Sequence, residues 1–196
     1  MVTHSLIAVD VAILPPPDTS RRAIDASAQL PRGESQGLLL GPEYLPHVTL
    51  LQMFVLADRL PALFDRLGAV LDDRAALTLH VSGGGTGGSS VWMAVDRSAT
   101  LVDLHERVLD AAHPFEEPHG DARAFYGDDA RERDVNWVTR YRKTSSHASF
   151  RPHITLGHAS HPPTIEPFDF TATTVAACHL GRFCSCRRVL RSWTPG

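Results

Sequence analysis

The 196-residue chain has little cysteine and no long hydrophobic run, and each scarcity excludes a class of protein. Its three cysteines, Cys178, Cys184 and Cys186, are an odd number gathered near the C-terminus. A disulfide-stabilised secreted domain carries a larger and even set, so these three are interpreted as reduced thiols. No stretch of about 18 apolar residues occurs, which excludes a membrane-spanning helix. The N-terminal residues lack a basic stretch followed by an apolar run, so we expect no signal peptide and a cytoplasmic protein.

The chain also has no large excess of either charge. It contains 19 Lys and Arg and 22 Asp and Glu, which gives a net charge of −3. A protein that binds long nucleic acid neutralises many phosphates with basic side chains, and this balance argues against a long duplex as partner. A small nucleotide or the end of an RNA remains compatible with it. The length and the 43% hydrophobic content are ordinary for a globular protein. We expect residues 1–196 to form one domain or one two-lobed unit, long enough to bury a core.

What the chain does contain is one short pattern that occurs twice, PHVTL at residues 46–50 and PHITL at residues 152–156. Successive side chains of a β-strand point to opposite faces, so the His and the Thr of each copy share one face. The intervening Val or Ile and the trailing Leu point the other way, toward a core. Each copy therefore predicts a strand that presents an imidazole and a hydroxyl side by side.

Two such strands facing one another would place His47, Thr49, His153 and Thr155 around a single anion. The unperturbed pKa of histidine, about 6.5, allows one imidazole to act as a base while the other donates a proton. The Thr hydroxyls would hold phosphoryl oxygens as these gain charge, and such chemistry requires no metal. With 11 histidines in the chain, one His-x-Thr arises easily by chance. Two copies that share the preceding Pro and the aliphatic pair predict a catalytic site for phosphate esters.

Hydrophobic periodicity predicts a mixture of strands and helices. Strands are expected at residues 5–14, 47–55, 77–82, 91–95, 168–180 and 182–193. Helices are expected at residues 18–30, 58–71 and 100–112, with N-caps at Asp18, Thr19 or Ser20, at Asp58 and at Thr100. The order strand, helix, loop, His motif recurs coarsely in the two halves.

Three segments carry weaker signals. The Gly-rich residues 83–90 are interpreted as a flexible hairpin connection, because they lack the Gly-Lys-Ser/Thr ending of a phosphate-binding loop. Trp92 is interpreted as a core residue. Residues 114–149 are rich in charge and are predicted to be irregular, with one short ordered element at residues 135–141.

The paired motifs resemble the signature of the 2H phosphoesterase superfamily, in particular its 2′-5′ RNA ligase-like and cyclic phosphodiesterase branch. That family carries His-x-Thr/Ser-hydrophobic twice, and both copies here match the pattern in full. The resemblance implies an α+β, two-lobed, pseudo-two-fold fold whose antiparallel sheets form a central cleft, with helices on the outside. It implies catalytic roles for His47 and His153 and phosphate-holding roles for Thr49 and Thr155. It also implies action without metal or other cofactor on 2′,3′-cyclic phosphates, 2′-5′ linkages or related nucleotide phosphodiesters.

Four further residues are candidates for substrate binding. Arg151 would share the strand face of His153 if that strand began early, and could contact phosphate. Tyr141 and Arg142 belong to a basic run that could stack a base and clamp a phosphate. Tyr44 lies just upstream of His47. A packing role for Tyr44 and a solvated role for the arginines are the alternatives.

Several hypotheses remain open. The main one is a metal-independent phosphodiesterase that opens 2′,3′-cyclic phosphates of nucleotides or RNA ends. The alternatives are 2′-5′ RNA ligation or 2′-5′ phosphodiester cleavage, a nucleotide-binding module without turnover, and a metal-dependent hydrolase. No metal site is expected, because Cys184-x-Cys186 lacks a second cysteine pair and His105-Glu106 lacks the second His of a zinc motif. Which His is acid and which is base does not follow from the sequence.

Overall fold

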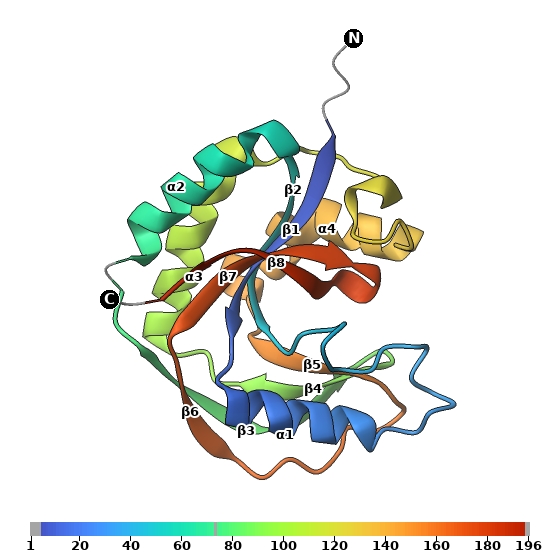
Figure 1. The fold of residues 1–196 in the computed structure, drawn as a ribbon. Helices are drawn as coiled ribbons and strands as arrows, with labels where there is room; N and C mark the ends of the chain where they lie inside the picture. The colour runs from blue at the N-terminus through green and yellow to red at the C-terminus, as the bar shows by residue number, and fades with distance from the viewer. Residues whose placement is uncertain (1–4, 73, 195–196) are drawn as a thin grey trace.

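The computed structural model describes residues 5–72 and 74–194, and its strands form one antiparallel eight-stranded sheet. The strands are β1 (Leu6–Leu14), β2 (Val48–Leu56), β3 (Leu77–Gly87), β4 (Ser90–Val95), β5 (His153–His158), β6 (Phe168–Ala172), β7 (Thr174–Gly181) and β8 (Ser185–Trp193). Their spatial order is β6-β3-β4-β5-β2-β1-β7-β8, so strands far apart in sequence become neighbours (Figure 1). Each half of the chain contributes to both sides of the central β2–β5 pair.

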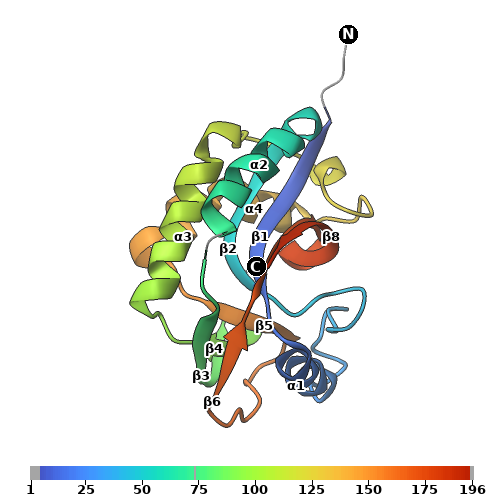
Figure 2. The ribbon, with the colours of Figure 1, turned by 60° about the vertical axis from the view of Figure 1, so that its left-hand side comes forward.

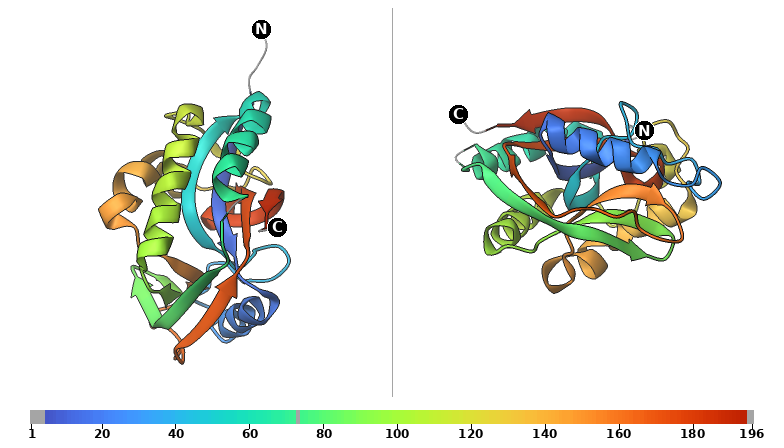
Figure 3. Two further views of the ribbon diagram at one scale, coloured as in Figure 1. Left: turned by 90° about the vertical axis from the view of Figure 1, so that its left-hand side faces the viewer. Right: turned by 90° about the horizontal axis from the view of Figure 1, so that it is seen from below.

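Four α-helices accompany the sheet in the described residues: α1 (Pro17–Ala28), α2 (Leu60–Leu71), α3 (Ala99–Ala112) and α4 (Glu132–Ser145). Helices α2 and α3 lie side by side along one half of the molecule, and α3 and α4 both contact β2 (Figure 2). Helix α1 lies at the other end, against β5 (Figure 3). The antiparallel sheet with helices outside it confirms the α+β fold class. None of the described helices is both long and apolar enough to cross a membrane.

The predicted helices form, but they begin at other caps. Helix α2 buries Leu63, Leu67 and Leu71, the i, i+4 stripe that the sequence indicates, and Pro61 lies in its first turn. Its N-cap is Arg59 and not Asp58. Helix α3 is capped by Ser98, whose side chain accepts a hydrogen bond from the Leu101 N–H at 3.3 Å, and not by Thr100. Helix α1 follows Pro16 and has no side-chain cap.

The Gly-rich segment is not the flexible connection that the sequence predicts, because β3 continues through it as far as Gly87. The chain reverses only at Gly88 and Ser89, where Gly88 has a φ of 62°. The indole of Trp92 occupies the space beside the glycines, and a Cβ at Gly87 would lie 2.8 Å from its Cη2 atom. The glycines therefore serve a close approach, which periodicity of apolar residues cannot reveal.

Two further segments differ from expectation. Residues 114–149 contain the 14-residue helix α4, with its acidic first turn and basic last turn, where the sequence predicts one short element. Only Asp134, Val138 and Tyr141 of this helix are buried, so it lacks the apolar stripe by which helices are recognised. The strand expected at residues 168–180 is two strands, β6 and β7, which part at Thr173.

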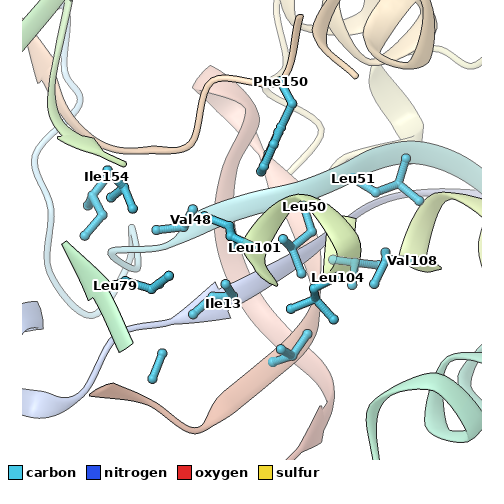
Figure 4. Close-up of a cluster of buried hydrophobic side chains, with 14 of the residues drawn as sticks. Ile13, Val48, Leu50, Leu51, Leu79, Leu101, Leu104, Val108, Phe150 and Ile154 are labelled. Carbon is cyan, nitrogen blue, oxygen red and sulfur yellow. The ribbon is translucent and has the colours of Figure 1, made fainter. Parts of the chain in front are cut away.

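The two motif strands meet at the centre of the sheet. Val48 of β2 pairs with Ile154 of β5, and both side chains are fully buried. They lie in one hydrophobic cluster with Ile13 of β1, Leu79 of β3 and residues of α3 (Figure 4). The core beneath the motifs thus comes from both halves of the chain.

Candidate active site

All four motif side chains, His47, Thr49, His153 and Thr155, line one cleft of about 840 Å³. The cause is the pairing of Val48 with Ile154, whose side chains face the core and leave their neighbours on the opposite face. Extended by one residue each way, the antiparallel register puts His47 across from Thr155 and Thr49 across from His153. The structure therefore brings together the residues that the repeated pattern predicts.

Both imidazoles are held by the same contact. The Nδ1 atom of His47 lies 2.7 Å from the carbonyl oxygen of Leu45, and Nδ1 of His153 lies 2.7 Å from that of Arg151. A carbonyl oxygen only accepts, so Nδ1 donates in each ring and Nε2 is left for proton exchange. In both cases the acceptor precedes the His by two residues, with a proline between that fixes the backbone φ.

A carboxylate that belongs to no motif in the sequence lies beside the first motif. Asp10 of β1 is fully buried, and its Oδ2 accepts hydrogen bonds from Thr49 Oγ1 and from Gln52 Nε2, each at 2.7 Å. The same oxygen lies 3.6 Å from His47 Nε2. Burial raises the pKa of Asp10, while the charge of His47 and the bonds from Gln52 and Thr49 act to lower it. The signal in the sequence is a single acid in an otherwise apolar strand.

The two Thr hydroxyls are not equivalent. Thr49 donates its hydroxyl hydrogen bond to Asp10, and its role in holding a phosphate stays a prediction. Thr155 is half-buried at the cleft, and within the described part of the chain its hydroxyl has no hydrogen-bond partner. Thr155 therefore presents a free donor to the cleft.

The second imidazole has an aromatic neighbour. The ring centroid of Trp92 lies 5.0 Å from that of His153. Burial and the charge of His47 lower the pKa of His153, against the opposite effect of its bond to the Arg151 carbonyl. Trp92 is half-buried and lines the cleft, so its assignment to the core was wrong.

Helix α4 forms the facing wall. Tyr141, one of the predicted binding residues, lines the cleft and is only 4% exposed, and its burial, with the charge of Asp10, raises the pKa of its phenol. Trp137 of the same helix is 47% exposed at the cleft. Arg151, also predicted, lines the cleft as an exposed cation, as does Arg133. The wall thus offers aromatic faces and positive charge.

Two predicted binding residues lie elsewhere. The Arg142 Nε donates to Glu116 Oε2 at 2.7 Å and an Nη to the Leu109 carbonyl at 2.8 Å, away from the residues that line the cleft. Tyr44 packs edge-on against Phe183, with ring centroids 6.3 Å apart, and is also absent from the cleft lining. Arg142 points away because α4 is a helix, whose adjacent residues face different directions.

Other lining residues carry no pattern in the sequence. His158 is buried, with a pKa lowered mainly by burial, and its ring centroid lies 5.3 Å from that of Phe183. Phe183 adopts a φ of 68°, and its N–H donates to Asp134 Oδ2 at 3.2 Å. Such a backbone persists only where its surroundings hold it, which here places an aromatic ring at the cleft. A lone His and a loop Phe offered no spacing by which to find them.

In the described residues, one set of potential metal ligands gathers near the site. The ligand atoms of Asp10, His47 and Cys186 lie within 4.8 Å of one another. Asp10 already accepts from Thr49 and Gln52, and burial raises the pKa of the Cys186 thiol well above its ordinary value. These features favour a hydrogen-bonded network over a metal centre. The absence of a metal stays a prediction.

Comparisons with known proteins agree with this architecture. A family model described as the 2′-5′ RNA ligase superfamily matches residues 16–173. The structure of E. coli LigT with 3′-AMP matches with a TM-score of 0.65 at 19% identity, covering 97% of this chain and 99% of that chain. The structure of TT0787 of Thermus thermophilus matches with a TM-score of 0.58 at 16% identity, covering 96% of this chain and 97% of that chain. Among curated proteins no sequence matches.

The structural matches establish the shared fold, and the family match spans both motifs. They confirm the resemblance that the repeated His-x-Thr pattern indicates. The chain therefore belongs to the 2′-5′ RNA ligase superfamily of 2H phosphoesterases.

Proposed function

We propose that this protein is a metal-independent phosphodiesterase that hydrolyses 2′,3′-cyclic phosphates of nucleotides or RNA ends. One observation carries the proposal: two imidazoles, each tied at Nδ1 to a backbone carbonyl, share one cleft. This arrangement supplies one proton acceptor and one proton donor at fixed positions. General acid–base catalysis of this kind contributes about 10²- to 10⁴-fold for each group.

The reaction needs two proton transfers. One His takes a proton from water, whose oxygen attacks phosphorus and forms a new P–O bond. The bond from phosphorus to one ribose oxygen breaks, and the other His protonates that oxygen. The product is a phosphate monoester, and exchange of one proton with solvent returns the site to its starting state.

Phosphate binding falls to groups that are free to donate. The hydroxyl of Thr155 lacks a partner within the described residues, and the exposed guanidinium of Arg151 lies at the same cleft. A hydrogen bond to a charged group contributes about 1.5–3 kcal/mol. Thr49 acts through Asp10, to which its hydroxyl donates a hydrogen bond.

The nucleoside would lie beside the more exposed aromatic residues Trp92 and Trp137, since stacking on a ring tolerates any base. Solved structures of LigT, which share the fold, contain 3′-AMP, NADP+ and ATP. Those ligands support a nucleotide phosphodiester as the substrate class. Free cysteines and such a substrate are compatible with the cytoplasm.

A second candidate is 2′-5′ RNA ligation, or cleavage of a 2′-5′ linkage, which the family description favours. The cleft carries Arg133 and Arg151 at its edge, where a second RNA end would find positive charge. Binding of a nucleotide without turnover is the remaining alternative.

Turnover of the four 2′,3′-cyclic nucleotides, a 2′-5′-linked dinucleotide and a pair of RNA ends, all in excess EDTA, tests the proposal. We expect hydrolysis of the cyclic nucleotides to a monoester at a rate that EDTA does not change. Activity only on the 2′-5′ linkage or the RNA ends would favour the second candidate. Binding of 3′-AMP with no turnover of any substrate would contradict an enzymatic role.

A further inference from the structure

The two halves of the site are built on the same strand register, and this makes their differences informative. In β1–β2, Asp10 pairs with Gln52 and Ala12 with Thr49, with a register shift between Val11 and Ala12. In β4–β5, Ser90 pairs with His158 and Trp92 with Thr155, with a register shift between Val91 and Trp92. The two pairings correspond position by position, including the irregularity.

This correspondence matches each residue of one half with a counterpart in the other. The counterpart of Asp10 is Ser90, and the counterpart of Trp92 is Ala12. The first histidine therefore has a carboxylate where the second has only a hydroxyl. The two halves therefore share their backbone pairing, whereas the acidic side chain occurs only in the half that carries His47.

The polar contacts of Asp10 gather on one of its two carboxyl oxygens. Its Oδ2 accepts from Thr49 Oγ1 and Gln52 Nε2, and both bonds favour the charged form of the carboxyl group against the effect of burial. Two hydrogen bonds reach that one oxygen, and His47 Nε2 lies 3.6 Å from it, close enough for an ion pair when the imidazole is protonated. Hydrogen bonds to a charged acceptor are the strong ones, and a neutral carboxyl would use them less well.

The groups that face Asp10 come from every element around it. They are His47 beside β2, Cys178 of β7, Cys184, Cys186 of β8 and Tyr141 of α4. Of these five, only His47 can carry a positive charge. A negative charge on Asp10 therefore stabilises the imidazolium form of His47, since the three cysteines and Tyr141 cannot become cations.

We infer that Asp10 is a positioning residue that makes the two histidines unequal, holding His47 protonated as the general acid and leaving His153 as the general base. In this scheme, which rests on the proposed function, His153 Nε2 takes the proton of the attacking water. His47 Nε2 gives its proton to the ribose oxygen that leaves phosphorus. Asp10 keeps its charge throughout and does not touch the substrate. It lies outside residues 16–173, the part that the family model matches.

The direct test is Asp10→Asn, which keeps the size of the side chain and removes its charge. A general acid must be protonated, so its loss of protons produces the alkaline limb of the pH–rate profile. We expect Asp10→Asn to move that limb to lower pH by about one unit or more and to lower kcat by about tenfold or more. The KM should change less, because Asp10 is buried behind the cleft surface.

Thermal stability separates this role from a structural one. Burial raises the pKa of Asp10 above its unfolded value, so stability is present below the unfolded pKa and is lost as pH rises through the folded pKa. At neutral pH the variant should therefore melt no lower than the wild type. Glu116→Gln is the matched control, since Glu116 is a partly buried carboxylate that binds Arg142 away from the cleft. It should lower the melting temperature and leave the alkaline limb in place.

A readout without substrate keeps this inference distinct from the proposed function. NMR of the ring nitrogens should show the titration of His47 moving to lower pH in Asp10→Asn, with His153 moving less. If the wild type turns over no substrate, the proposed function fails and the NMR titration still decides the role of Asp10.

The converse variant, Ser90→Asp, places a carboxylate at the counterpart position and serves also if Asp10→Asn does not fold. It should move the acidic limb, which reports the base His153, to higher pH. The inference is overturned if Asp10→Asn leaves the His47 titration unchanged or moves the acidic limb. It is also overturned if Ser90→Asp leaves the acidic limb in place.

Discussion

At the scale of single residues, the two catalytic candidates are held alike and surrounded differently. His47 and His153 each donate from Nδ1 to a carbonyl two residues upstream, which fixes the ring and its tautomer. Asp10 lies beside the first ring and Trp92 beside the second. A site with two equal bases would have no preferred direction, and these neighbours supply one.

The free hydroxyl of Thr155 makes a residue-scale prediction. We expect Thr155→Ala to lower kcat/KM by about 10- to 100-fold, because it removes a hydrogen bond worth about 1.5–3 kcal/mol to a charged phosphate. Steady-state kinetics on a 2′,3′-cyclic nucleotide measures this. Thr144→Ala is the control, since Thr144 also lines the cleft but donates its hydroxyl to the Arg140 carbonyl at 3.1 Å. Equal effects of the two variants would contradict a special role for Thr155.

Residue-scale prediction from sequence succeeded where alternation along a strand decided the outcome. The His and Thr of each motif share a face because successive strand residues must point opposite ways. Asp10 was missed because its partners, Thr49 and Gln52, are distant in sequence. Long-range contacts of this kind leave no periodic signal.

At the scale of elements, the glycines of strand β3 leave room for a side chain of the neighbouring strand β4. The indole of Trp92 lies across Gly85 and Gly87, and a Cβ on either would clash with the ring. Because these positions of β3 have no side chains, the indole of Trp92 can lie against them and next to His153. What the sequence presents as a loop is a surface that positions Trp92.

Gly85→Ala tests this arrangement. The new Cβ would overlap the indole, and overpacking of this kind costs about 1–3 kcal/mol. We expect a lower melting temperature together with a lower kcat/KM, as Trp92 is pushed against the second motif. Gly33→Ala is the matched control, because its Cβ would meet nothing within 4 Å. A variant with unchanged activity would show that Trp92 does not depend on the glycines.

Element prediction from sequence followed the strength of the apolar stripe. Helices α2 and α3 were predicted because leucines and valines recur along them and are buried. Helix α4 was missed because it covers the cleft with polar and aromatic residues, and only three residues of the whole helix are buried. An element whose inner face lines a site has little apolar pattern to reveal it.

At the scale of the whole molecule, buried imidazoles link stability to pH. Burial is the main cause that lowers the pKa of four histidines, which are His105, His153, His158 and His179. His105 shows why a buried imidazole resists protonation. Its Nδ1 donates to the Leu50 carbonyl, and its Nε2 accepts from the His147 N–H. Protonation of Nε2 would break the second bond.

The lowered pKa values of these histidines determine how the free energy of unfolding changes with pH. The unfolded histidines take up protons as pH falls below about 6.5, whereas the folded ones resist until a lower pH. Stability is therefore full above the unfolded pKa and is lost as pH falls through the folded pKa values. The raised pKa of Asp10 has the opposite effect on the pH dependence of stability, but it is one group against four histidines. Urea unfolding at pH 8, 6.5 and 5 should give falling free energies of unfolding, and His105→Ala should flatten the decline. A free energy that rises toward pH 5 would contradict this.

The coarse repeat in the sequence has a structural counterpart in the matching registers of β1–β2 and β4–β5. Their correspondence could not be predicted, because side chains outside the two motifs diverge. The single continuous sheet supports residues 1–196 as one two-lobed domain, which stays a prediction.

The most direct test of the two-histidine mechanism compares turnover of a 2′,3′-cyclic nucleotide in excess EDTA by wild type, His47→Ala and His153→Ala. His161→Ala is the control, because His161 is exposed and does not line the cleft. We predict that each motif variant loses at least about 10²-fold in kcat, while the control and the chelated wild type keep full activity. Full turnover by either motif variant, or loss of wild-type activity in EDTA, would contradict the account.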